Sequence, residues 1–218
     1  MSHADHSPIQ APARPEPPPP ANPLTQDEIR SAFRRPHQVA ELVLADWPKI
    51  TASVAQKRNL LALTVLLALT SALLPMPYAA IIESGGLWKI SALFGGSLLI
   101  CFPSLHIFST YVGSRVRIEQ SLVLALVISA VAALFALGFA PILWFLRVTM
   151  AGGTDSIALT GLSNILLSFA LLAGIGHQAR CLFIEEKLRP STSQPLVFFV
   201  WWILLAFITY RMSVTLEI

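Results

Sequence analysis

Five long stretches of the chain contain no aspartate, glutamate, lysine or arginine, and this feature limits the possible folds more than any other. The stretches hold 24, 25, 27, 24 and 21 residues, and they cover residues 59–82, 90–114, 120–146, 156–179 and 190–210. About 20 residues of α-helix cross the roughly 30 Å hydrocarbon layer of a bilayer. Strands of a membrane barrel alternate strictly between apolar and polar residues, and these stretches do not. The sequence therefore predicts an all-α membrane protein with five transmembrane helices, in which each helix satisfies its own backbone hydrogen bonds.

Two other arrangements of the same stretches remain open at this point. Apolar helices in the core of a soluble protein usually run to about 10 to 14 residues, which is shorter than any of the five. Pro75 and Pro77 are expected to disturb the end of the first span, and a four-span protein with one re-entrant segment would have its break there or near Gly152. The composition favours a membrane protein, because 12% of the residues are charged, compared with about 25% in soluble domains.

Lysine and arginine are distributed unevenly between the two sides that five spans create. Twelve of the 15 precede the first span or lie in the loops after spans two and four, whereas Lys89, Arg147 and Arg211 lie on the other side. Cytoplasmic segments of membrane proteins are enriched in these residues. We therefore expect a cytoplasmic amino terminus and an outside carboxyl terminus. The excess of arginine over lysine and the abundant alanine favour a bacterial inner membrane.

Prolines and charges divide the chain into three parts. Residues 1–24 contain eight of the 16 prolines, and such a segment buries too little apolar surface to fold, so a disordered Pro-rich tail is expected. Residues 25–58 are expected to form cytosolic or interfacial amphipathic helices. Residues 59–218 form the predicted five-helix transmembrane domain.

The segment after the tail has the pattern of short helices. Thr25 and Glu28 have the spacing of a capping box, which predicts a helix that ends before Pro36. Beyond it an apolar stripe recurs at helical spacing, with Pro48 as a possible kink; the stripe consists of Val39, Val43, Trp47, Ile50 and Val54. An apolar stripe with basic flanks is typical of a helix that lies on a membrane surface. The candidate membrane-surface contacts are Arg34, Arg35, Val43, Trp47, Lys57 and Arg58, and packing of the same stripe on cytosolic loops or on a partner is the alternative.

Polar residues within the spans are few, and none of the spans contains an internal charged side chain. Ion- and proton-coupled transporters usually keep such charges in the bilayer, so their absence argues against an ion-coupled pump. The candidate intramembrane polar contacts are His106, Asn164 and Ser168. Asn164 and Ser168 are expected to hydrogen-bond to another helix, with His106 as a candidate partner. We expect no catalytic residues, no metal site and no cofactor.

Small and aromatic residues predict how the spans pack and where they end. Small residues let helix backbones approach closely in lipid, and they form a ridge in span three and recur in span four, for example at Ala170 and Gly174. Tryptophan and tyrosine are enriched at membrane interfaces. The expected interfacial anchors are Trp88, Trp144, Trp201, Trp202 and Tyr210.

The order of these segments resembles one known family. Phe102-Pro103-Ser104, Tyr111-Val112-Gly113 and Phe139-Ala140-Pro141 are similar to the ends of spans two and three in the Ypt/Rab-interacting-protein (Yip) family. The resemblance covers the topology from about Phe33 onward and implies a non-catalytic membrane organiser. The Asp-Leu-x-Gly-Pro element of the eukaryotic branch is missing, so the resemblance does not imply binding of Rab-type GTPases.

These observations lead to one expected function and one alternative. We expect an integral membrane scaffold or partner-binding protein without catalytic activity. The alternative is a channel or a component of a lipid or small-molecule permease. The expected partners are the lipid bilayer and either a protein partner or a second copy of the chain. No nucleic acid is expected, because the basic residues are not concentrated in a patch or stripe.

Overall fold

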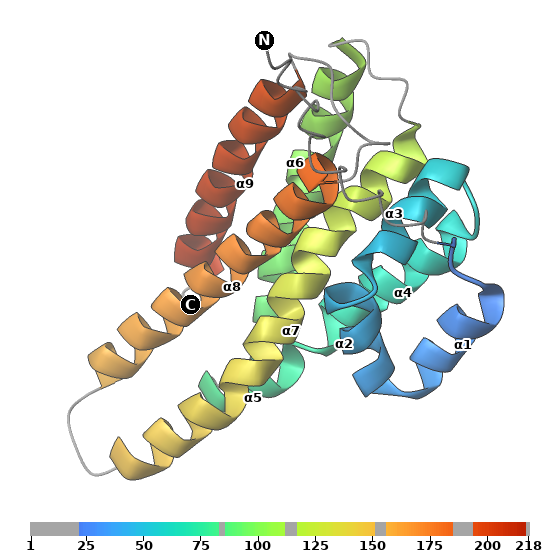
Figure 1. Cartoon of the computed structure of the whole chain (residues 1–218). Coiled ribbons are helices and arrows are strands. Elements are labelled where there is room, and N and C mark those ends of the chain that lie inside the picture. Colours follow the sequence, from blue (N-terminus) through green and yellow to red (C-terminus); the bar gives the residue numbers. More distant parts are fainter. Residues whose placement is uncertain (1–21, 83–85, 112–116, 151–155, 185–193, 217–218) are drawn as a thin grey trace, which may run out of the picture.

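The computed structural model describes residues 22–82, 86–111, 117–150, 156–184 and 194–216, and this part of the chain is helical without a β-strand (Figure 1). The helices are α1 (Gln26–Arg34), α2 (Pro36–Leu44), α3 (Trp47–Gln56), α4 (Leu60–Leu73), α5 (Met76–Ile82), α6 (Lys89–Tyr111), α7 (Ile118–Met150), α8 (Ser156–Ile184) and α9 (Gln194–Leu216).

Five helical segments are long and apolar enough to cross a membrane. They are α4 with α5, taken together as one segment of 23 residues, and α6, α7, α8 and α9. The predicted all-α fold with five such segments is confirmed. The first segment is interrupted where Pro75 and Pro77 were expected to disturb it, because α4 ends at Leu73 and α5 begins at Met76. Proline has no N–H to donate and its ring crowds the preceding turn, so the interruption lies where the backbone cannot continue regularly.

The first helix has the capping box that the sequence predicts. The Glu28 backbone N–H donates to Thr25 Oγ1 at 3.3 Å, and the Thr25 N–H donates to Glu28 Oε2 at 2.8 Å. The helix ends at Arg34 because Arg35, which precedes a proline, is extended with φ −134° and ψ 103°. Both the start and the stop of α1 therefore follow from local chemistry.

The apolar stripe occupies two helices rather than one kinked helix. The chain leaves helical geometry at Asp46, which follows the cap residue of α2, and Pro36 and Pro48 each lie in the first turn of a helix. Proline is well tolerated there because the first N–H groups of a helix have no intrahelical partner. Pro48 therefore helps to begin α3, and the expected kink is wrong.

The long helix α7 forms the centre of the bundle. It packs against α4, α5, α6 and α8 along its length, and α9 lies at one edge against α6 (Figure 1). The helices α1, α2 and α3 lie on the opposite flank from α9, where α1 contacts α4 and α2 contacts α7. We refer to α1–α3 as the amino-terminal layer.

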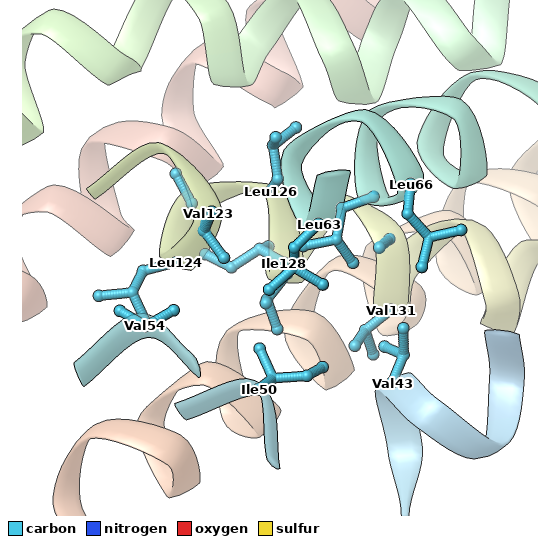
Figure 2. Close-up of a cluster of buried hydrophobic side chains, with 14 of the residues drawn as sticks. Val43, Ile50, Val54, Leu63, Leu66, Val123, Leu124, Leu126, Ile128 and Val131 are labelled. Carbon is cyan, nitrogen blue, oxygen red and sulfur yellow. The ribbon is translucent and has the colours of Figure 1, made fainter. Parts of the chain in front are cut away.

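The amino-terminal layer and the spans share one hydrophobic core. Figure 2 shows Val43, Ile50 and Val54 of the layer in the same cluster as Leu63 of α4 and Ile128 of α7. The core also includes Leu24, which is 2% exposed and so does not belong to the expected disordered tail. Residues 1–21 of that tail lie outside the described residues. The layer is therefore packed on the bundle as part of it.

Candidate functional site

Leu24, which lies just before α1, connects the amino-terminal layer to the bundle through hydrogen bonds. The Leu24 N–H donates to Ser53 Oγ of α3 at 2.7 Å, and the Leu24 carbonyl accepts from Asn59 Nδ2 at 2.9 Å. Asn59 precedes α4 and has a positive φ of 53°, which asparagine tolerates better than most residues. Both backbone groups of a buried residue are thus satisfied by side chains from two other elements.

A second junction joins α3 to the beginning of α7. Gln120, which is 7% exposed, donates from Nε2 to the Val54 carbonyl at 2.6 Å. Its Oε1 accepts the backbone N–H of Arg117 at 2.9 Å. The Lys57 N–H donates to the same Val54 carbonyl at 3.3 Å. One glutamine therefore connects the end of the amino-terminal layer to the start of the central span.

A third junction joins three spans through one fully buried side chain. Gln178 of α8 donates from Nε2 to the Leu124 carbonyl of α7 at 2.8 Å, and its Oε1 accepts from Trp202 Nε1 of α9 at 2.7 Å. A buried amide is costly unless its donors and acceptors are paired. Pairing with two different helices fixes α8 and α9 relative to α7 at this level.

Two polar atoms near this region are buried and have no hydrogen-bond partner. They are Nε2 of His177, which precedes Gln178 in α8, and Oε1 of Gln38 in α2. The backbone of Val43 in α2 lies beside the His177 ring. These two side chains, one in α2 and one in α8, therefore retain hydrogen-bonding capacity inside the protein.

The candidate membrane-surface residues are found in two different environments. Val43 is 0% exposed and packs in the shared core, so its expected contact with lipid is wrong: the spans of the chain itself cover the apolar stripe. Trp47 is half-buried, and Arg34, Arg35, Lys57 and Arg58 are exposed. The alternative in which the stripe packs on protein fits this burial.

The three candidate intramembrane residues are not joined into one site. His106 of α6 is half-buried, and its Nδ1 is buried without a partner. Ser168 is exposed and donates to the Asn164 carbonyl in its own helix at 2.8 Å. Among the described residues no hydrogen bond connects Asn164 or Ser168 to His106. The expected bonds between helices are made instead by other residues: Ser71 with Ser129 at 2.5 Å, and Tyr78 with the Ser163 carbonyl at 3.0 Å.

Close packing of α7 and α8 follows the predicted small residues. A Cβ atom added at Gly174 would lie 2.5 Å from the backbone oxygen of Ile128, so the two helices meet at that point almost backbone to backbone. Ala132, Ala136 and Ala170 are each 0% exposed in the same region. The expected interfacial role of Trp201 is wrong, because its side chain is 0% exposed and Nε1 donates to the Cys101 carbonyl at 3.0 Å. The anchors with large exposed surfaces are Trp88, Trp144 and Tyr210.

Outside the spans, Lys49 of α3 forms two ion pairs, of which the one with Glu28 joins α3 to α1. Its Nζ lies 2.9 Å from Asp46 Oδ2 and 3.2 Å from Glu28 Oε1. Hydrogen bonding to the Thr25 backbone and then to the Thr25 and Lys49 side chains lowers the pKa of Glu28, although partial burial opposes this effect. Hydrogen bonds to Asp46 and Glu28 raise the pKa of Lys49. Like the Leu24–Ser53 hydrogen bond, the Lys49–Glu28 ion pair connects the α1 region to α3.

Sequence reasoning missed Gln120 and Gln178, the two glutamines that form the second and third junctions. A signal was present, since Gln120 and Gln178 each lie close to one end of an uncharged stretch. Among the described residues no group of three histidine, cysteine, aspartate or glutamate side chains is placed to hold a metal ion. Comparisons of the chain with protein-family models, with characterised proteins and with solved structures find no match.

Proposed function

We propose that the chain is an integral membrane scaffold that binds a protein partner on the outer face of the amino-terminal layer. The observation that carries the proposal is the shared core, since Ile29, Val43 and Ile50 of the layer are buried with residues of the spans. A partner bound to the layer would therefore be held rigidly relative to the membrane. The proposal keeps the expected orientation, with the layer on the cytoplasmic side, and the expected likeness to Yip-type organisers.

The outer face of the layer has the chemistry of a docking surface. Phe33 and Leu44 are 45% and 43% exposed, although both belong to helices whose other face is buried. Exposed charged side chains are their neighbours along the two helices: Arg30 and Arg34 beside Phe33 in α1, and Glu41 one turn before Leu44 in α2. Aromatic and aliphatic anchors within a polar rim are typical of protein interfaces.

The use of polar groups inside the bundle also supports a structural role. Gln178, Ser129 and Tyr78 each hydrogen-bond to another helix, and these bonds stabilise one arrangement of the spans. A scaffold requires that kind of fixed geometry. The proposal includes the absence of catalysis, because the spans contain no internal charged side chain.

The test is purification of the full chain in mild detergent, followed by mass spectrometry of co-eluting proteins. A double variant, Phe33→Ser with Arg34→Glu, changes exposed residues of the layer and leaves the core intact. We expect a stoichiometric partner that this variant loses. The matched control is Tyr210→Ser with Arg211→Glu, an exposed aromatic–basic pair on α9, which should keep the partner.

A second candidate function, a permease component, is favoured by one observation. His106 keeps Nδ1 buried and unpartnered in α6, as a side chain that meets a passing polar solute would. Solute flux from liposomes that contain the chain alone would support this candidate, and His106→Ala should then change the flux. Flux together with no co-eluting partner would overturn the scaffold proposal.

A further inference from the structure

Basic residues from two distant parts of the sequence, Lys57 with Arg58 and Arg117, lie where the end of α3 meets the start of α7. The Val54 carbonyl accepts from the Lys57 N–H at 3.3 Å and from Gln120 Nε2 at 2.6 Å, while Gln120 Oε1 accepts from the Arg117 N–H at 2.9 Å. The backbones of Lys57 and Arg117 are therefore joined through one carbonyl and one side chain. Arg58 follows Lys57 in the same turn, and its N–H donates to the Ser53 carbonyl at 3.0 Å.

A fourth basic residue comes to the same end of the bundle on α8. Arg180 is exposed and lies two residues after Gln178, whose amide donates to Leu124 of α7, one turn beyond Gln120. The helix α3 packs against both α7 and α8. We refer to Lys57, Arg58, Arg117 and Arg180 as the basic seam.

Among the described residues, the positive charge of the basic seam is largely uncompensated. In the part of the chain that the structure describes, Lys49 forms ion pairs and the four residues of the seam do not. Glu119 is an acidic side chain in the first turn of α7 and is outnumbered by the four cations. The positive end of the α7 helix dipole lies at the same place and adds to the attraction for an anion.

The position of the basic seam relative to the apolar helices identifies the anion. Span one begins at Leu60, span three begins at Ile118 and span four ends at Arg180 itself, so all four cations lie at the boundary of the apolar segments. Lipid phosphate groups lie at this level of a bilayer. Basic residues between transmembrane helices at the cytoplasmic boundary bind anionic headgroups, and arginine suits phosphate because its planar guanidinium donates two hydrogen bonds together.

We propose that the basic seam is a binding site for the phosphate-bearing headgroup of an anionic phospholipid. Its occupant would connect the turn after α3 to the ends of two spans. The lipid would thus stabilise the attachment of the amino-terminal layer to the bundle. The inference rests on the five spans and not on the proposed scaffold function, so it stands or falls independently of any protein partner.

The experiment measures lipid binding to the full chain in detergent by native mass spectrometry, with phosphatidylglycerol and phosphatidylcholine as the two probes. We expect phosphatidylglycerol to bind more tightly. The triple variant Lys57→Gln, Arg58→Gln and Arg117→Gln should bind phosphatidylglycerol at least about tenfold more weakly, because each basic residue near an anionic surface contributes measurably to the attraction. Phosphatidylcholine binding should not change.

The matched control removes the same amount of charge from the outer face of the layer. Arg30→Gln, Arg34→Gln and Arg35→Gln alter three exposed arginines that lie on and just after α1. This control should bind phosphatidylglycerol as the unaltered chain does. Equal weakening in the control would show diffuse surface attraction and would overturn the proposed site.

Two further measurements follow. One distinguishes a lipid headgroup from free phosphate, and the other tests the site if the triple variant does not fold. Inorganic phosphate at the concentration of the lipid should not displace phosphatidylglycerol, and full displacement would show a site for a free anion and overturn the lipid assignment. If the triple variant does not fold, Arg58→Gln and Arg180→Gln are tested singly. Each should weaken binding of phosphatidylglycerol about threefold, and two unaffected single variants would contradict the proposal.

Discussion

Two pairs of helices in this bundle achieve close contact by opposite means. The pair α7–α8 meets through missing side chains, because Gly174 lies against the backbone of Ile128. The pair α6–α9 meets through a large side chain, because Trp201 is fully buried and hydrogen-bonds the Cys101 carbonyl. Gly96 of α6 lies beside α9 too, but the atom nearest to it is the flexible end of Met212.

The difference shows that similar uncharged stretches can occupy very different positions. In the most apolar 18-residue segment of α7, 61% of the segment is buried within the protein, compared with 17% in the corresponding segment of α9. Lipid chains are as apolar as leucine, so hydrophobicity alone does not draw one span to the centre. Small residues and buried amides do so by allowing close backbone packing and by pairing polar groups. The central helix α7 carries a row of small buried residues, among them Ala132 and Ala136, whereas α9 carries large exposed apolar side chains such as Phe199 and Phe207.

The largest expected effect comes from filling the α7–α8 contact. Gly174→Ala places a methyl group 2.5 Å from a backbone oxygen, so a helix must shift. We expect the free energy of unfolding to fall by about 3 kcal/mol, as for overpacked cores. Denaturant unfolding in detergent micelles measures this change.

Two control variants sharpen this test. Gly176→Ala lies in the same helix with no atom within 4 Å of the added Cβ, and Gly96→Ala meets a methionine that can move away. Both should change the free energy of unfolding by less than about 1 kcal/mol, since alanine also favours helix over glycine. If Gly96→Ala lowered the free energy of unfolding as much as Gly174→Ala does, the contrast between the pairs α6–α9 and α7–α8 would be contradicted.

The next effect concerns the buried amide that joins three spans. Gln178→Leu removes the bonds to the Leu124 carbonyl and to Trp202 Nε1. We expect a loss of about 2 kcal/mol in the free energy of unfolding, in the upper range for hydrogen bonds between membrane helices. Ser168→Ala, which breaks a bond within one helix, should cost less than about 0.5 kcal/mol. Equal costs would show that the junction does not stabilise the bundle.

A smaller and more local effect is expected at the attachment of the amino-terminal layer. Ser53→Ala leaves the buried Leu24 N–H without its acceptor, which costs about 1 kcal/mol. Hydrogen exchange should become faster in α1 and remain unchanged in α7. Ser31→Ala is the control, because Ser31 is exposed and its hydroxyl donates within α1. Faster exchange throughout the spans would contradict a local junction.

The smallest effect is a dependence on pH outside the spans. Because hydrogen bonds lower the pKa of Glu28 in the folded chain, its contribution is present above the unfolded pKa and is lost as the pH falls through the folded pKa. The side chains of Lys49 and Glu28 are 36% and 41% exposed, so the contribution is below about 0.5 kcal/mol. The hydrogen-exchange protection factors of α1, which are corrected for the slower intrinsic exchange in acid, should therefore fall as the pH is lowered.

Glu28→Gln should remove this dependence on pH, and Asp27→Asn, which changes an exposed carboxyl in the same turn, should keep it. A loss of protection in acid that persists in Glu28→Gln would assign the dependence to another group.

Much of the fold could be predicted because its causes are local. The length of the stretches without charged residues predicts the five apolar helices. The Thr25–Glu28 spacing predicts the start of α1, and Pro75 predicts the interruption of span one. Each depends on residues near one another in the chain. Periodicity also identified the apolar stripe with Val43, although it did not show that the spans cover that stripe.

The polar junctions could not be predicted because they depend on the approach of distant segments. The sequence does not show which carbonyl Gln120 or Gln178 reaches, since every helix presents the same backbone groups. Trp201 and Trp202 are neighbours with the same expected role, yet one is buried and the other is half-buried. Their difference arises from the rotation of α9 against α6, which hydropathy does not determine.

The central claim is that the chain crosses the membrane five times, which places its two ends on opposite sides. The most direct test fuses two reporters after Ile218 in bacterial cells: a phosphatase that is active only outside the cytoplasm, and a fluorescent protein that matures only inside it. With the amino-terminal layer in the cytoplasm, the account predicts an active phosphatase and a dark fluorescent protein. A bright fluorescent protein with an inactive phosphatase would contradict it.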